Sequence, residues 1–151
     1  MSGRKIIARN RKAFHEYHIE TTYEAGLVLL GSEIKSIRNN QISLREGFVQ
    51  ARDNELWLMG VHIALYEQAS FFGHDDALRP RKLLLHKKEI AKIIRQLHER
   101  GYTAVPLQVY LERGRAKVDI AVAKGKRLHD KRQANAKRDV ERDIRRQIKD
   151  G

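Results

Sequence analysis

Two stretches near the end of the chain, each with an apolar residue at every second position, constrain the fold most. They consist of Val105, Leu107, Val109 and Leu111, followed by Val118, Ile120 and Val122. A period of two is typical of a β-strand with one buried face. The residues between them, 112–115, read Glu-Arg-Gly-Arg and suit a hairpin turn. The sequence therefore predicts an antiparallel hairpin.

Weaker signals of the same kind predict further strands. Residues 13–21 form an alternating segment that puts Tyr17 and Ile19 on one face. Residues 48–51 and 56–63 flank an Asp-Asn pair, which can adopt the positive φ of a tight turn. These segments add to the antiparallel strands of the predicted body.

One helix interrupts the strands, because Ile90, Ile93, Ile94 and Leu97 recur at helical spacing. The order is several strands, then this helix, then the final hairpin. We expect a mainly β protein, a small closed barrel of the OB type with one long helix. A β-sandwich is the alternative, and it is less favoured because the helix would have to cover one face.

The composition excludes several classes of protein. With 151 residues and 41% hydrophobic content, the chain has the size and apolar content of one domain with a core. It has no cysteine, which rules out disulfides, thiol nucleophiles and cysteine-ligated zinc. No apolar run approaches the roughly 18 residues of a membrane span. We expect a soluble protein of the cytoplasm with no membrane partner.

Charge is concentrated at the two ends of the chain. The total is 31 Lys and Arg against 19 Asp and Glu, a net charge of +12. Residues 1–12 carry a net +5 and residues 124–151 a net +6, which leaves the middle nearly neutral. Phosphate polyanions are the partner that such ends favour, since neutralised phosphates release counterions. Solvated, disordered tails are the alternative interpretation.

This pattern divides the chain into a basic N-terminal arm at 1–12, an OB-type barrel at 13–123 and a basic C-terminal tail at 124–151. In the tail, Val140, Ile144 and Ile148 recur every four residues. Such a thin stripe is too narrow for a helix that is stable alone. We expect the tail to be disordered when free and helical when bound.

No pattern in the sequence demands catalysis. His15 and His18 lie three apart on a predicted strand, which puts them on opposite faces. Phosphate-loop and nucleophile-elbow motifs are absent from the sequence. We expect no enzyme activity, no metal and no cofactor, and a metal-dependent nuclease is the last of the alternatives.

Cationic residues along the body suggest an RNA-binding surface instead. Glu33, Lys35 and Arg38 are expected on one strand. The candidate contacts are Asn10, Arg11, Lys12, Lys35, Arg81, Lys82 and Lys117. Aromatic residues are scarce at 7%, which favours recognition of folded RNA by shape and backbone over base stacking. A ribosomal-type structural protein and a general single-strand-binding OB protein remain as rival interpretations.

Several motifs, in order along the chain, resemble the tmRNA-binding small protein B family, also called SsrA-binding protein. The resemblance runs from about Asn10 to Arg132. Its main blocks are Asn10–Ala13, Tyr23–Leu27, Leu30–Ser36, Arg81–His86, Gly101–Thr103, Val105–Leu107 and Ala123–Arg127. Any one block is weak, but the ordered series is specific to the family.

The resemblance implies an OB-type barrel that binds the tRNA-like domain of tmRNA and delivers it to stalled ribosomes for trans-translation, which rescues them by peptide tagging. Its matching RNA-contact positions are Asn10, Glu24, Leu84 and Lys117. Leu84 lies in a run of three leucines, so from the sequence it is either a core residue or an RNA-facing one. We expect the free protein to be a monomer.

The resemblance also implies that the tail senses the empty decoding centre and mRNA channel. His129 takes the position of a ring that stacks on a decoding nucleotide. The predicted ribosome contacts are Lys124, Gly125, Lys126, Arg127, His129, Asp130, Lys131, Arg132, Ile144 and Ile148.

Overall fold

The computed structural model of the chain describes residues 4–65 and 76–125. Nine strands and three helices follow one another there: β1 (Lys5–Arg9), α1 (Arg11–Glu16), β2 (Tyr17–Leu27), α2 (Gly31–Arg38), β3 (Ile42–Ser43), β4 (Phe48–Arg52), β5 (Glu55–Met59), β6 (His62–Ile63), β7 (Arg81–Leu84), α3 (Lys87–Leu97), β8 (Tyr102–Glu112) and β9 (Arg115–Gly125). The protein is therefore mainly β, as predicted.

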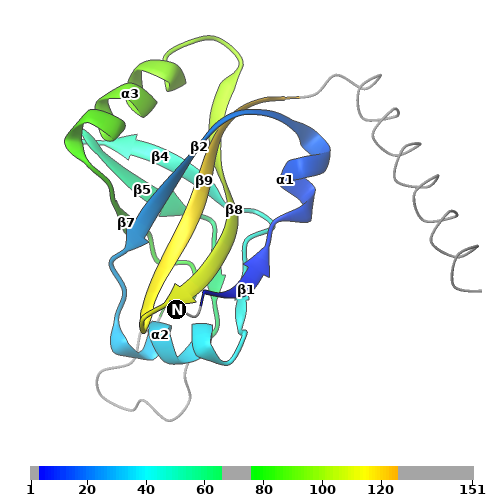
Figure 1. Cartoon of the computed structure of the whole chain (residues 1–151), viewed down its shortest axis with the longest axis vertical. Helices are drawn as coiled ribbons and strands as arrows, with labels where there is room; N and C mark the ends of the chain where they lie inside the picture. Colours follow the sequence, from blue (N-terminus) through cyan, green and yellow to red (C-terminus); the bar gives the residue numbers. More distant parts are fainter. Residues whose placement is uncertain (1–3, 66–75, 126–151) are drawn as a thin grey trace, which may run out of the picture.

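Seven strands form one antiparallel sheet in the order β1-β8-β9-β2-β7-β5-β4, and β3 pairs with β6 in a separate ribbon. The closed barrel is not confirmed, because β1 and β4 end the strand order and are not paired with each other in the part of the chain described. Figure 1 shows α1 and α3 toward one end of the molecule and α2 at the other.

Both hairpin turns lie where the sequence predicts them. Asp53 and Asn54 have φ of 53° and 61° between β4 and β5. Arg113 and Gly114 have φ of 52° and 76° between β8 and β9. Two consecutive left-handed residues give a type I′ turn, whose twist matches that of the flanking strands.

Two segments that were expected to be strand, 13–16 by alternation and 31–38 without such a pattern, are helical. Residues 11–16 form α1 because the Asn10 side chain accepts a hydrogen bond from the Ala13 amide at 3.2 Å and caps the helix. Residues 31–38 form α2, where the Glu33 carboxylate accepts a hydrogen bond from the Leu30 amide at 2.8 Å. In short segments such local capping bonds outweigh a weak tendency to form a strand.

The main core cluster joins residues of the sheet with Ile37 of α2 and Ile93 of α3. Ile93 of α3 packs with residues of β5, β7 and β9, among them Leu58, Leu83 and Ile120, all nearly inaccessible to solvent. Within residues 4–65 and 76–125 no helix is both long and apolar enough to cross a bilayer.

Candidate nucleic-acid interface

Three of the predicted RNA contacts meet on one face of the sheet. Gly26 of β2 pairs with Leu84 of β7 on one side and with Lys117 of β9 on the other. Glu24 lies two residues earlier on the same strand. Together with the start of α3 these residues line a groove of about 340 Å³, here called the β2 groove: Glu24, Ala25, Gly26, Leu84, Leu85, His86, Glu89 and Lys117.

Leu84 is an exposed side chain, so it is not the core residue that the leucine run also allowed. It is 53% exposed, whereas its neighbour Leu83 is 1% exposed and belongs to the core. A Cβ atom on Gly26 would lie 3.3 Å from the Leu84 Cβ, closer than such atoms normally approach. The glycine therefore leaves room for Leu84 to lie over β2 in the groove.

Glu24 is the centre of a small charge network in this groove. Its carboxylate accepts hydrogen bonds from the Tyr110 hydroxyl and from Lys117 Nζ, the latter at 3.2 Å. The Tyr110 hydrogen bond is the main cause that holds the pKa of Glu24 below its usual range, and Lys117 acts in the same direction. Glu24 is thus an ionised acceptor, able to receive hydrogen bonds from ribose hydroxyls or base amino groups.

The sequence interpretation missed Arg4 and Tyr110 in this network. The Arg4 guanidinium lies 3.6 Å from the centre of the Tyr110 ring and ion-pairs with Glu24 at 3.4 Å and with Asp119 at 3.6 Å. Arg4 directly precedes β1, and the strand order β1-β8-β9-β2 brings it close to Glu24 on β2. Because this proximity depends on the strand order, no local pattern in the sequence could predict it.

Lys82 and Lys35 lie outside the β2 groove. Lys82 shares a face of β7 with Leu84 and ion-pairs at 2.8 Å with Glu55 of the neighbouring strand β5. Lys35 is exposed on α2. Both are accessible cations, but they do not line the groove with Leu84.

Arg81 is fully buried, which leaves it no surface for an RNA contact. Its Nε donates to Glu33 Oε2 at 2.8 Å and its Nη1 to the Val61 carbonyl at 2.6 Å. Arg81 therefore holds α2 against β7 and is omitted from the proposed interface. Arg81 lies two residues before the buried Leu83, so on a strand both side chains point to the same face. This spacing could have predicted that Arg81 is buried.

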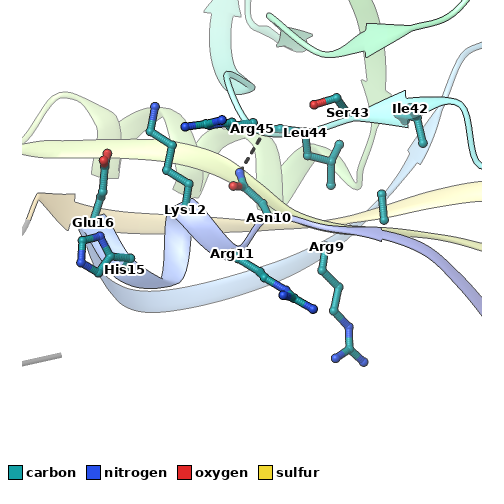
Figure 2. A pocket seen from close by; sticks show the side chains of 11 residues that line it. Arg9, Asn10, Arg11, Lys12, His15, Glu16, Ile42, Ser43, Leu44 and Arg45 are labelled. Atoms are coloured by element: carbon teal, nitrogen blue, oxygen red, sulfur yellow. Dashed lines mark hydrogen bonds between the residues drawn. The ribbon is translucent and has the colours of Figure 1, made fainter. Parts of the chain in front are cut away.

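Asn10 is also buried, at 3% exposure. Its Nδ2 donates to the carbonyls of Leu44 at 3.2 Å and Pro106 at 2.9 Å, the first of which is drawn in Figure 2. Arg11 and Lys12 follow it on α1 and line a second hollow, separate from the β2 groove. Asn10 thus positions its neighbours and is omitted from the proposed direct contacts.

Only the first two residues of the predicted ribosome-contacting set are described. Lys124 and Gly125 end β9, with Lys124 Nζ 5.6 Å from the centre of the Tyr102 ring. Lys126, Arg127, His129, Asp130, Lys131, Arg132, Ile144 and Ile148 lie outside the described residues. In the described part of the chain, no cluster of three His, Asp or Glu residues could hold a metal ion.

An antiparallel sheet that carries a groove of mixed charge, on a chain with a net charge of +12, is typical of a small nucleic-acid-binding protein of the β class. The family described as "SmpB protein" matches residues 7–150. The chain belongs to the SmpB family, as the sequence motifs predicted.

Relatives and a solved structure agree with this assignment. The SsrA-binding protein of Roseiflexus sp. (strain RS-1) is 53% identical over 97% of this chain and 92% of the relative. The SsrA-binding protein of Ligilactobacillus salivarius is 53% identical over 95% of this chain and 92% of the relative. A chain from the structure described as "tmRNA-SmpB: a journey to the center of the bacterial ribosome" is 41% identical, with a TM-score of 0.68, over 86% of this chain and 94% of that one.

Proposed function

We propose that this protein binds the tRNA-like domain of tmRNA through the β2 groove and delivers it to stalled ribosomes for trans-translation. The observation that carries the proposal is the convergence of Glu24, Leu84 and Lys117 around Gly26 in a member of the SmpB family. The names of the relatives, which mention SsrA and tmRNA with the ribosome, support the choice of partners.

The groove suits a folded RNA because it offers three kinds of contact side by side. Lys117 supplies a positive charge for a phosphate, Glu24 an acceptor for hydroxyl or amino groups, and Leu84 an exposed apolar surface for a ribose or base face. Such a mixture recognises a local RNA shape better than a purely cationic patch, which would bind any phosphate backbone.

We further propose the division of labour expected from the sequence. The arm at 1–12 and the body at 13–123 together hold the tmRNA, while the tail from 124 onward senses the empty decoding centre and mRNA channel. The end of β9 at Gly125 supports a boundary close to this position. The proposal includes no catalytic step, and it places the protein in the cytoplasm with the ribosome.

Competition binding tests the first half of this proposal. A labelled tRNA-like domain of tmRNA is bound to the full chain and competed with unlabelled tmRNA fragment, tRNA or poly-U. We expect the tmRNA fragment to compete best, and equal competition by poly-U would contradict the proposal. Lys117→Glu should weaken binding, whereas Arg113→Glu, an equal charge change in the exposed β8–β9 turn, should have little effect.

Deletion of residues 129–151 tests the second half. We expect nearly unchanged affinity for the tRNA-like domain and loss of peptide tagging on stalled ribosomes in a reconstituted translation system. A tail of the same composition in scrambled order is the matched control, since it keeps the charge but destroys the Val140–Ile144–Ile148 stripe. Tagging by the scrambled protein would show that the tail contributes only charge.

A further inference from the structure

A further hollow, here called the α3 hollow, lies between α3 and the β4–β5 turn. Figure 1 shows the β4–β5 hairpin beside the start of α3. The hollow shares no lining residue with the β2 groove. It has a volume of about 450 Å³ and is lined by Lys87, Ile90, Ala91, Ile94 and Arg95 of α3 and by Asn54 of the turn.

The floor of the α3 hollow is aliphatic. Ile90 and Ile94 lie one helical turn apart, are half-buried and pack against the main core cluster. Ala91 is exposed between them, and its short side chain leaves the space above the floor open. Because the core holds the two isoleucines in place, the hollow is formed before any partner binds, which lowers the entropy cost of binding.

The charge around this floor is positive. Four exposed cations belong to α3, and the first and last of them line the hollow: Lys87, Lys88, Lys92 and Arg95. None of the four forms an ion pair with any residue in 4–65 or 76–125. Glu89 is the single acid of α3, and it accepts a hydrogen bond from the His86 amide at 3.3 Å and lines the β2 groove instead. The cationic rim is therefore open to an acidic partner.

The combination of an aliphatic floor and a cationic rim favours a partner with apolar side chains next to carboxylates. RNA is a poorer match, because no aromatic side chain lines the described hollow and only Asn54 could accept a hydrogen bond from a base. A second copy of the chain, with a net charge of +12, has the same sign as the rim. The same holds for the chain's own residues 124–151, with a net charge of +6.

We propose that the α3 hollow is a docking site for an acidic amphipathic segment of another protein. Apolar side chains of that segment enter the hollow over the two isoleucines, while its Asp or Glu side chains pair with Lys87 and Arg95. The Arg95 guanidinium can donate two parallel hydrogen bonds to one carboxylate, which fixes the orientation of the segment. The proposal does not depend on which RNA the β2 groove takes.

A displayed library of short random peptides tests the chemistry of the occupant without assuming a partner. The library is selected on the full chain at about 0.15 M salt, which screens non-specific attraction to a basic protein. A parallel selection uses the Ala91→Glu/Arg95→Glu variant. We expect peptides that are enriched only on the unchanged chain, and we expect these to combine apolar residues with neighbouring Asp or Glu.

One such peptide, synthesised with a fluorescent label, is then titrated with single variants by anisotropy. Arg95→Glu should bind it about tenfold more weakly or worse, because a carboxylate then faces a carboxylate. The matched control is Arg100→Glu, an equal charge change at an exposed residue outside the hollow, which should bind like the parent. Thermal melts establish that every variant is folded.

A second matched pair separates charge from space. Ala91→Glu and Ala91→Lys both fill the hollow with a long side chain at an exposed helical position. Ala91→Glu should lose more affinity for the peptide than Ala91→Lys, since only the former repels carboxylates. Lys87 is left unchanged in these tests because it directly follows His86, which lines the β2 groove.

Several results would overturn the inference. Enrichment of the same peptides on both proteins, or of peptides without acidic residues, would show that the hollow selects no acidic segment. Equal losses for Ala91→Glu and Ala91→Lys, or for Arg95→Glu and Arg100→Glu, would contradict a specific carboxylate contact. Weaker binding of the tRNA-like domain to Arg95→Glu would assign the hollow to RNA. Failure of the proposed function is reported separately, by the response of tmRNA binding to Lys117→Glu.

Discussion

Lys117 Nζ lies 3.2 Å from Glu24 Oε1, a diagonal pair across β9 and β2 that borders the exposed Leu84 side chain. Register explains the pair, because Glu24 is opposite Asp119 and Gly26 is opposite Lys117. The cation and the carboxylate hold each other at the edge of the groove, both still accessible to a ligand. A ligand phosphate can therefore compete for Lys117 without any rearrangement of the backbone.

Leu84 and Leu83 form a matched pair for testing which leucine serves the fold and which the groove. Leu84→Asp should change the free energy of unfolding by less than about 1 kcal/mol, because the side chain is mostly exposed. Leu83→Asp should cost about 4 kcal/mol or more, because it puts a carboxylate in the core. Urea unfolding measures both.

The same Leu84 variant should bind the tRNA-like domain about tenfold more weakly or worse, as gel shifts would show. Leu84→Asn distinguishes loss of the apolar surface from repulsion by the new charge. A Leu84→Asp protein that melts far below the parent, or that binds RNA normally, would contradict an exposed RNA-binding side chain at this position.

Gly26→Ala should impair RNA binding with only a small change in stability. The added methyl group would lie 3.3 Å from Leu84 Cβ, so it should displace that side chain from its place over β2. Gly31→Ala is the control, because a Cβ there meets no atom within 4 Å. Gel shifts with the tRNA-like domain should show weaker binding for Gly26→Ala alone, and equal behaviour of the two variants would refute the steric argument.

Tyr110→Phe should raise the pKa of Glu24 toward its ordinary value. The Tyr110 hydroxyl makes the hydrogen bond that contributes most to lowering this pKa. In the parent protein the stabilisation from Glu24 is present above the unfolded pKa of about 4.3 and is lost as the pH falls through the lower folded value. Carboxyl NMR titration of Glu24 measures the change.

Tyr102→Phe is the control for that titration. Its hydroxyl donates to Glu20 at 2.9 Å and makes no hydrogen bond to Glu24, so the Glu24 titration should be unaffected. An unchanged Glu24 titration in Tyr110→Phe would show that Lys117 and Arg4 alone set the charge state of the groove.

Glu33→Gln should destabilise the fold by about 3 to 5 kcal/mol, because it leaves the guanidinium of Arg81 buried without its counter-ion. Burial raises the pKa of Glu33, but hydrogen bonds from Arg79, the Leu30 amide and Arg81 outweigh it and keep the pKa below the usual range. Glu46→Gln should cost less than about 1 kcal/mol, since its pair with Lys12 is exposed. Similar destabilisation of the two variants in urea unfolding would count against a structural role for the buried pair.

The sequence by itself determined the long hairpin of β8 and β9, both tight turns and α3. In each case the residues that decide the conformation are neighbours along the chain: alternating Val and Leu, an Asp-Asn pair, or isoleucines at helical spacing. Its ordered motifs also determined the family. At 13–16 and 31–38 the prediction of strand was wrong, because a single capping side chain decided the local structure.

Only the tertiary structure decided which predicted RNA-binding residues can reach an RNA. Arg81 and Leu84 lie three residues apart and both were predicted to bind RNA, yet one is buried against Glu33 and the other is exposed beside Gly26. Their surroundings come from α2, β2 and β9, distant segments whose positions depend on strand order and register. Likewise, Asn10 resembles a surface polar residue in the sequence and becomes a buried bridge once Leu44 and Pro106 are packed around it. Burial and proximity depend on the whole chain, and no local pattern encodes them.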